Sequence, residues 1–347
     1  MNLPNTTFLV PGGIAIQYEG KTILVTGAVG FIGSKMSQLL STVKCRLLLL
    51  DLLEQPSYIP DNPVAEIKYI QTDITSSNCW RSVLPDVDYI FHFAALEYNR
   101  KNFDIERDLN INAISIYYML ECCHQNNLHP KIIFSSSANI FGIVDKLPVD
   151  ETVSDNPLSL WSAHKLMAEN YFRIYARRHG IESIILRLAN VYGPTADKTT
   201  TGNVIINRVI AKALSGSALV TYSNRNCPRD FVYIDDVILA FLYAGTIDHS
   251  LYDGRFYVVG SGEGKTIAEV WQIIADKVKA YTHKDVSVEA NDSVKLEPLD
   301  MRQFVADSAA FRKVTNWEPQ VALEKGADLT VRALMELSQH KHVEKIY

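Results

Sequence analysis

Short apolar runs alternate along the chain with longer segments in which apolar residues recur at helical spacing. Such runs, rich in Val, Ile and Leu, are typical of buried strands, and the helical spacing is typical of helices packed against them. Their alternation predicts a doubly wound α/β fold with a parallel sheet. Helices are expected at about 104–126 and 160–179. The runs that predict strands are 22–26, 46–51, 67–71, 89–93, 131–135, 183–188 and 256–259.

The stretch from the first predicted strand to the end of the second has the features of a nucleotide-binding unit. Gly27, Gly30 and Gly33 follow the first strand at three-residue spacing, and a helical pattern begins within that turn. Glycines permit a tight turn, a close approach of diphosphate to the helix N-terminus, and close packing of helix on strand. Asp51 ends the second strand, where its carboxylate can accept hydrogen bonds from ribose hydroxyls and repel a 2′-phosphate. Because no Arg or Lys follows it, NAD is favoured over NADP.

The same pattern predicts two domains of unequal size. Residues 1–20 form a polar N-terminal extension. Residues 21–190 and about 251–261 form the nucleotide-binding domain, and about 191–250 and 262–347 form a smaller substrate domain. Ligands of such sheets bind beyond the carboxyl ends of the strands, so the loops there are expected to line one cleft.

Composition and charge exclude several functions. The chain has 347 residues, 47% of them hydrophobic, and a formal net charge of −5 without a basic tract, so nucleic-acid binding is not expected. No apolar run is long enough for a membrane span, and the N-terminus does not read as a secretory signal. The five cysteines are scattered, which favours reduced thiols in the cytoplasm, and the nine histidines show no metal-ligand spacing, so no metal is expected.

Several motifs in fixed order resemble the extended short-chain dehydrogenase/reductase family, whose members modify nucleotide sugars. The resemblance covers about 21–335 and rests on G-A-V-G-F-I-G at 27–33, H-F-A-A at 92–95, N-I-N-A at 110–113, F-S-S-S-A-N-I-F-G at 134–142 and R-D-F-V-Y-I-D-D-V at 229–237. It implies a Rossmann fold, NAD as cofactor and a nucleoside-diphosphate sugar as substrate. The cofactor-binding residues that it implies are Gly27, Gly30, Phe31, Ile32, Gly33, Asp51, Asp73, Ile74, Phe93, Ala94, Ala95, Asn110 and Lys165.

The catalytic set of the family is a Ser or Thr with a Tyr and a Lys spaced Y-x-x-x-K. In this sequence the serine corresponds to Ser137 and the lysine to Lys165, but the tyrosine position holds Trp161. In the family the lysine holds the nicotinamide ribose, and the tyrosinate takes a proton from the sugar hydroxyl while hydride leaves the same carbon. An indole N–H donates a hydrogen bond but has no usable acid or base pKa, so the usual proton carrier is absent.

This substitution leaves three interpretations open. Another group could carry the proton, and Glu97 and Tyr98 are the first candidates because their loop faces the reacting sugar in the family; His164 ranks lower because it is expected to point away from the cleft. The protein could instead bind NAD and a nucleotide sugar with weak or no catalysis. It could also catalyse a step for which the tyrosine is dispensable.

The residues after the serine help to select the reaction. Dehydratases of the family carry an Asp-Glu pair there, whereas this chain has Ala138-Asn139-Ile140, so a 4,6-dehydratase is disfavoured. The stretch is most similar to that of epimerases, with ketoreductases and decarboxylases next. The resemblance assigns diphosphate contacts to Asn190 and Arg229, and weaker assignments fall on Asn203 and Arg302.

Family members commonly dimerise through two helices, which correspond here to about 104–126 and 160–179. The outer apolar residues of these helices fit such an interface, so a homodimer is expected. They are Tyr117, Met167, Tyr171 and Ile174.

Overall fold

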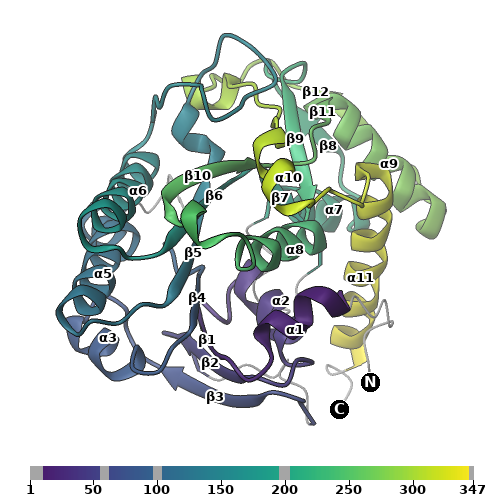
Figure 1. The fold of residues 1–347 in the computed structure, drawn as a ribbon. Coiled ribbons are helices and arrows are strands. Elements are labelled where there is room, and N and C mark those ends of the chain that lie inside the picture. The colour runs from purple at the N-terminus through teal and green to yellow at the C-terminus, as the bar shows by residue number, and fades with distance from the viewer. Residues whose placement is uncertain (1–10, 55–61, 97–103, 195–203, 344–347) are drawn as a thin grey trace.

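The computed structural model describes residues 11–54, 62–96, 104–194 and 204–343. Its centre is a seven-stranded sheet in which each strand pairs in parallel with its neighbours, in the order β10-β6-β5-β4-β1-β2-β3 (Figure 1). The predicted doubly wound α/β fold is confirmed, and the strand order reverses between β1 and β4. The strands are β1 (Thr22–Thr26), β2 (Arg46–Asp51), β3 (Glu66–Gln71), β4 (Tyr89–His92), β5 (Lys131–Ser137), β6 (Ser183–Leu188) and β10 (Asp253–Val259).

Helices cover both faces of this sheet, which explains why its central strands are apolar at successive positions. Apolar side chains of α1 (Gly12–Tyr18), α2 (Phe31–Leu40) and α8 (Ile234–Ala244) form one buried cluster with the sheet. Those of α3 (Ser77–Val83), α5 (Ser115–Gln125) and α6 (Leu160–His179) form another. In Figure 1 the two sets of helices lie on opposite sides of the strands.

The predicted helix at 104–126 is not regular. It consists of α4 (Ile105–Leu109), a π-helical turn η1 (Asn110–Ile114) and α5. Asp104 caps its N-terminus, because the side chain accepts a hydrogen bond from the Arg107 amide. A π turn inserts one residue into the helix and is frequent at functional sites. The inserted residue therefore rotates the side chains of α5 about the helix axis relative to those of α4.

Two smaller sheets lie beyond β6. A three-stranded sheet has the order β11-β9-β7 and a two-stranded sheet pairs β12 with β8. Only Ala189 separates β6 from β7, so the smaller sheets begin where the central sheet ends. The boundary between the two predicted domains stays a prediction. The remaining elements are β7 (Asn190–Tyr192), α7 (Ile205–Leu214), β8 (Leu219–Thr221), β9 (Pro228–Tyr233), β11 (Gly264–Thr266), α9 (Ile267–Thr282), β12 (Val288–Ala290), α10 (Ala309–Thr315) and α11 (Leu323–Val343), with 3-10 turns η2 (Ala138–Phe141), η4 (His249–Leu251) and η5 (Pro298–Met301).

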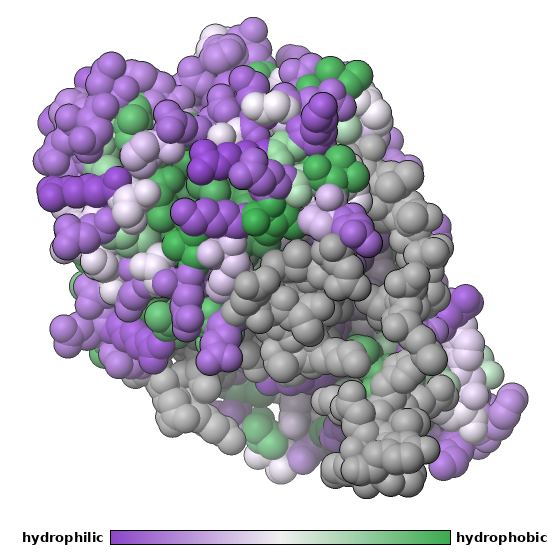
Figure 2. Space-filling model, turned by 90° about the horizontal axis from the view of Figure 1, so that it is seen from below, coloured by the Kyte–Doolittle hydropathy of each residue, from purple (hydrophilic) through white to green (hydrophobic). Residues whose placement is uncertain are grey.

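The described surface is of mixed polarity. Seen from below, it is largely hydrophilic, with smaller groups of hydrophobic residues between the polar ones (Figure 2). Within the described residues, no helix combines the length and the apolar character that crossing a membrane requires. All five cysteines lie in the described part of the chain, and each is buried as a free thiol.

Candidate active site

A pocket opens at the carboxyl ends of β1, β2 and β4, where the strand order reverses. Eight of the predicted cofactor-binding residues line it together: Gly27, Gly30, Asp51, Asp73, Ile74, Phe93, Ala94 and Ala95. Sequence reasoning missed further lining residues, namely Val29, Leu50, Leu52, Leu53, Thr72, Leu96, Arg107 and Ile111. Phe31, Ile32 and Gly33 lie at the start of α2, Asn110 opens η1, and Lys165 lies on α6; none of these five lines the pocket.

The glycines after β1 allow the backbone to pass closely under this pocket. Gly27 has a φ of +65°, and a side chain there would place its Cβ 2.7 Å from the Ala94 nitrogen. A Cβ on Gly33 would collide with the Gly27 carbonyl, so α2 packs on the turn only without a side chain at that position. Gly30 is the N-cap residue of α2 and lines the pocket, so the N-terminus of this helix adjoins the pocket. A helix N-terminus is a favourable place for an anion such as a diphosphate.

The Asp51 carboxylate fastens this turn to the end of β2. Its Oδ2 accepts a hydrogen bond from the Val29 amide at 2.8 Å, and its Oδ1 accepts one from the Leu53 amide at 3.2 Å. The Leu53 carbonyl in turn accepts a hydrogen bond from the Tyr69 hydroxyl at 2.7 Å. The carboxylate is thus fixed at the pocket wall, where it can accept hydrogen bonds from a cis-diol.

Ser137 lies on β5, and Lys165 on α6 is hydrogen-bonded to the backbone of the same strand two residues earlier. Ser137 ends β5, and its Oγ accepts a hydrogen bond from the Asn139 amide at 3.1 Å. Lys165 is 4% exposed, and its Nζ donates to the Ser135 carbonyl at 3.1 Å and lies 4.7 Å from the centroid of the Phe134 ring. Burial lowers the pKa of Lys165 to about 8, although the nearby carboxylates of Asp108 and Glu169 oppose this shift.

Trp161 lies one helical turn before Lys165, but its indole does not offer its N–H to a ligand. Nε1 donates a hydrogen bond of 2.7 Å to the carbonyl of Leu96, just beyond β4. At the position that the family resemblance assigns to the proton carrier, the side chain is therefore already engaged with the backbone. The first two candidates for its replacement, Glu97 and Tyr98, lie outside the described residues and stay predictions.

His164 packs against α4. Its Nδ1 lies 2.5 Å from Oδ2 of Asp108, and Oδ1 of Asp108 accepts a hydrogen bond of 2.7 Å from the Asn112 side chain. Asn112 also donates to the Leu96 carbonyl at 3.3 Å. Sequence reasoning missed Asp108 and Asn112, although their i, i+4 spacing placed them on one face of a predicted helix.

Two arginines, the buried Arg229 and the partly buried Arg302, are held by the segment around Asp300 and by two asparagine side chains. Arg302 donates hydrogen bonds to the side-chain oxygens of Asn139 and, at 3.3 Å, Asn190. Arg229 donates to the Asp300 carbonyl at 2.7 Å, while its Nη1 is buried with no hydrogen-bond partner among the described residues. Burial and the charge of Arg229 lower the pKa of Arg302 to about 9. Two guanidinium groups held close together in this way favour an anionic ligand. The fourth predicted substrate residue, Asn203, lies outside the described residues.

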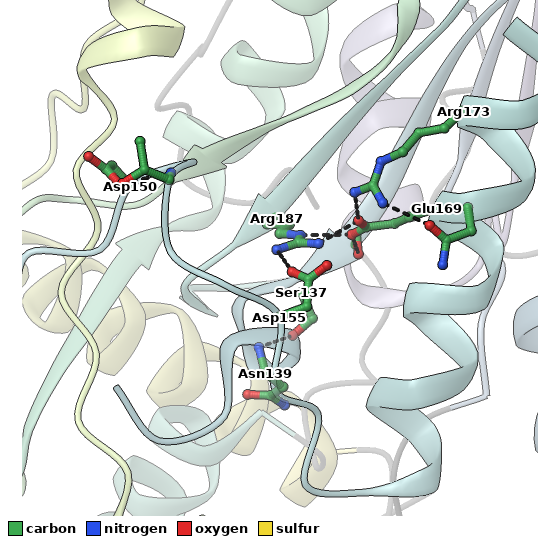
Figure 3. Close-up of polar contacts among 10 residues, drawn as sticks. Ser137, Asn139, Asp150, Asp155, Glu169, Arg173 and Arg187 are labelled. Carbon is green, nitrogen blue, oxygen red and sulfur yellow. Dashed lines mark hydrogen bonds and ion pairs between the residues drawn. The ribbon is translucent and has the colours of Figure 1, made fainter. Parts of the chain in front are cut away.

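A buried ionic network supports the residues around Ser137 (Figure 3). Glu169 accepts hydrogen bonds from Arg187 at 2.9 and 2.7 Å, from Arg173 at 2.9 Å and from the Ser136 hydroxyl at 2.6 Å. Arg187 also donates to Asp155 at 2.6 Å. Because these residues come from β5, β6 and α6, the network fixes the strand end that carries Ser137 relative to the helix that carries Lys165.

Comparisons with known proteins identify the family and fold of this chain. The sequence profile of the NAD dependent epimerase/dehydratase family matches residues 23–260. A Methanocaldococcus jannaschii protein provisionally named a UDP-glucose 4-epimerase is 31% identical over 308 residues, which are 85% of this chain and 97% of that protein. The UDP-glucose 4-epimerase of Mycolicibacterium smegmatis is 27% identical over 328 residues, which are 91% of this chain and 99% of that protein. A solved UDP-N-acetylglucosamine 4-epimerase from Methanobrevibacter ruminantium M1, in complex with UDP-N-acetylmuramic acid, is similar with a TM-score of 0.80 and 26% identity, over 92% of this chain and 99% of that one.

Proposed function

Because the chain belongs to the NAD-dependent epimerase/dehydratase family, we propose that it epimerises a nucleoside-diphosphate sugar, specifically a UDP-sugar at carbon 4. The observation that carries this proposal is the pair of arginines Arg229 and Arg302, of which Arg302 is joined to Ser137 through Asn139. A diphosphate bound to the arginines would bring its attached sugar toward the serine, between the arginine pair and the nucleotide pocket.

The pocket residues fit NAD. The Gly27 turn leaves room that a Cβ would fill, and the fixed carboxylate of Asp51 suits the two hydroxyls of an adenosine ribose. When bound, NAD supplies a hydride acceptor. Lys165 has one described hydrogen-bond acceptor, the Ser135 carbonyl, so its other N–H groups can hold a second ribose.

Ser137 is suited to bind the oxygen at the reacting carbon. Its Oγ already accepts a hydrogen bond from the Asn139 amide, which leaves the hydroxyl proton to be donated to a sugar hydroxyl or ketone. A donor at this place stabilises the ketone that forms when the carbon loses hydride. The oxidation also needs a group to accept the hydroxyl proton, and we propose Glu97 or Tyr98 for this role, because Trp161 occupies the position of the family's tyrosine and cannot perform it.

A second candidate function is binding of NAD and a nucleotide sugar without turnover. Trp161 favours it, because the indole neither takes up nor releases a proton as a catalytic acid or base near neutral pH and its N–H is engaged with the Leu96 carbonyl. Both candidates predict binding of NAD and UDP, so binding alone does not separate them.

Turnover of a panel of UDP-, GDP-, CDP- and dTDP-sugars with added NAD separates them. Products are identified by mass and by NMR. A UDP-sugar product of unchanged mass with an inverted centre at carbon 4 supports epimerisation. A product of different mass, or tight binding without any product, would overturn it.

We further propose a cytoplasmic homodimer that pairs α5 and α6 with their symmetry mates. Tyr117 on α5 is 38% exposed and Ile174 on α6 is 46% exposed, and the Tyr117 and Tyr171 rings lie 6.1 Å apart across the two helices. Light scattering should give twice the chain mass for the wild type. Ile174→Arg should give the chain mass, because it places charge in the middle of the apolar surface.

A further inference from the structure

The carbonyl of Leu96 is held by two side chains from different helical segments. The Trp161 indole donates to it at 2.7 Å from α6, and the Asn112 amide donates to it at 3.3 Å from η1. Leu96 itself lines the nucleotide pocket, immediately after Phe93, Ala94 and Ala95. The backbone that follows β4 is thus held by two hydrogen bonds to the Leu96 carbonyl, at a residue that lines the pocket.

The two donors are connected through a second set of hydrogen bonds. Asn112, 1% exposed, uses its other N–H to bind Asp108, whose carboxylate is fully buried. Asp108 binds His164, which lies three residues after Trp161 on the same helix. The contacts therefore close a ring that runs from α6 to Leu96, to Asn112, to Asp108 and back to α6.

The orientation of Asn112 in this ring is determined by its neighbours. Both of its amide N–H groups meet acceptors, the Leu96 carbonyl and the Asp108 carboxylate, so the opposite orientation would bring an oxygen against two oxygens. The π turn η1 contains Asn112 and begins two residues after Asp108. Because a π turn shifts the helix phase, it sets which side chains of this segment face α6.

We propose that Trp161, with the His164–Asp108 pair, is a positioning residue that shapes the cofactor pocket of this chain through the Leu96 carbonyl. The proposal rests on the proposed function in taking NAD as the ligand of that pocket. Tryptophan at position 161 then has two consequences. The site lacks the proton carrier that the family has at this position, and the segment that follows β4 gains a hydrogen bond that holds it in place.

The ring also explains why removing the indole N–H should affect one ligand and not the other. Leu96 lines the nucleotide pocket, whereas the described hydrogen bonds of Arg229 and Arg302 go to Asp300, Asn139 and Asn190 and to no member of the ring. Loss of one neutral hydrogen bond corresponds to roughly a fivefold change in an equilibrium constant. We expect Trp161→Phe to loosen the segment after β4 in the ligand-free protein, so that NAD binding must order it; this should raise the Kd of NAD by up to about fivefold and leave the Kd of UDP unchanged.

The chain offers a matched control for this variant. Trp271 also has a buried indole, whose Nε1 donates a hydrogen bond of 3.1 Å to the Val220 carbonyl. Neither Trp271 nor Val220 lines the nucleotide pocket. Trp271→Phe removes the same kind of hydrogen bond and should leave both Kd values unchanged. His164→Gln keeps a donor for Asp108 and should bind NAD nearly as well as the wild type, whereas His164→Leu should bind it more weakly.

The experiment combines calorimetric titration of NAD and UDP with amide hydrogen exchange over residues 93–96 in the ligand-free protein. Trp161→Phe should exchange faster there than the wild type and Trp271→Phe should not. Unchanged exchange and unchanged NAD binding in Trp161→Phe would overturn the proposal, as would an equal loss of UDP binding. If the wild type bound no NAD while exchange still rose in Trp161→Phe, the ring would stand and the proposed cofactor would be wrong.

Discussion

Lys165 should reduce the stability of the ligand-free protein, and the effect should depend on pH. Its pKa is lowered from 10.5 to about 8 because its ammonium group is buried. Below pH 8 the native and unfolded chains both hold the proton, so the full cost of the buried charge is present. Between pH 8 and 10.5 the unfolded chain binds a proton that the native chain has released, so rising pH relieves that cost.

Lys165→Met removes the titration while keeping a side chain of similar length. For this shift in pKa, the linkage relation predicts that Lys165 lowers the free energy of unfolding by about 3 kcal/mol at pH 7 and by about 1.4 kcal/mol at pH 9.5. The free energy of unfolding of the wild type, relative to the variant, should therefore rise by about 2 kcal/mol between these pH values. The contributions of other titrating groups cancel in this difference because both proteins contain the same groups.

Urea unfolding of both proteins at pH 7 and pH 9.5 measures this difference, with the slope of unfolding free energy on urea as a check that the two transitions are comparable. A difference that stays constant with pH would refute the reasoning, since it would mean that Lys165 titrates alike in both states. Saturating NAD should reduce the pH dependence if ribose hydroxyls bind the ammonium group.

Other substitutions test separate parts of the site. Arg302→Leu should raise the Kd of UDP at least tenfold by calorimetry and leave that of NAD unchanged, because it removes charge-assisted donors; equal losses would count against a diphosphate site. Asp51→Ala should raise the Kd of NAD about tenfold and reduce the ratio of the Kd of NADP to the Kd of NAD. An unchanged ratio would argue against a contact between Asp51 and the ribose. Glu169→Gln should lower the free energy of unfolding by about 3 kcal/mol, because it removes the negative charge that faces the buried Arg187 guanidinium. Asp253→Asn, which breaks an exposed ion pair with Arg255, should change the free energy of unfolding by less than about 1 kcal/mol, and equal effects of the two substitutions would contradict this account.

The fold and the nucleotide pocket could be predicted because their signals are local. Strand–turn–helix order, the glycine spacing and the position of Asp51 all lie within a single stretch of about thirty residues. Gly27, Gly30 and Asp51 of this stretch do line one pocket, together with five residues from later strand ends that the family resemblance had implied. In such a unit, neighbours in sequence are also neighbours in space, so sequence spacing carries most of the geometry.

The partners of the site residues could not be predicted in this way. Arg302 bonds Asn139 from 163 positions away, and Trp161 bonds a backbone carbonyl 65 positions away. A backbone acceptor leaves no mark in the sequence, since every residue has one. The π turn was also missed, because a helical pattern of apolar residues does not reveal a single inserted residue.

The measurement that tests the central claim most directly is turnover of UDP-glucose that carries deuterium at carbon 4, with NAD added and products followed by NMR and mass. Epimerisation by removal and return of hydride predicts UDP-galactose of unchanged mass with the deuterium still at carbon 4. Loss of the deuterium, a change in mass, or no product from protein that binds both NAD and UDP would contradict the account.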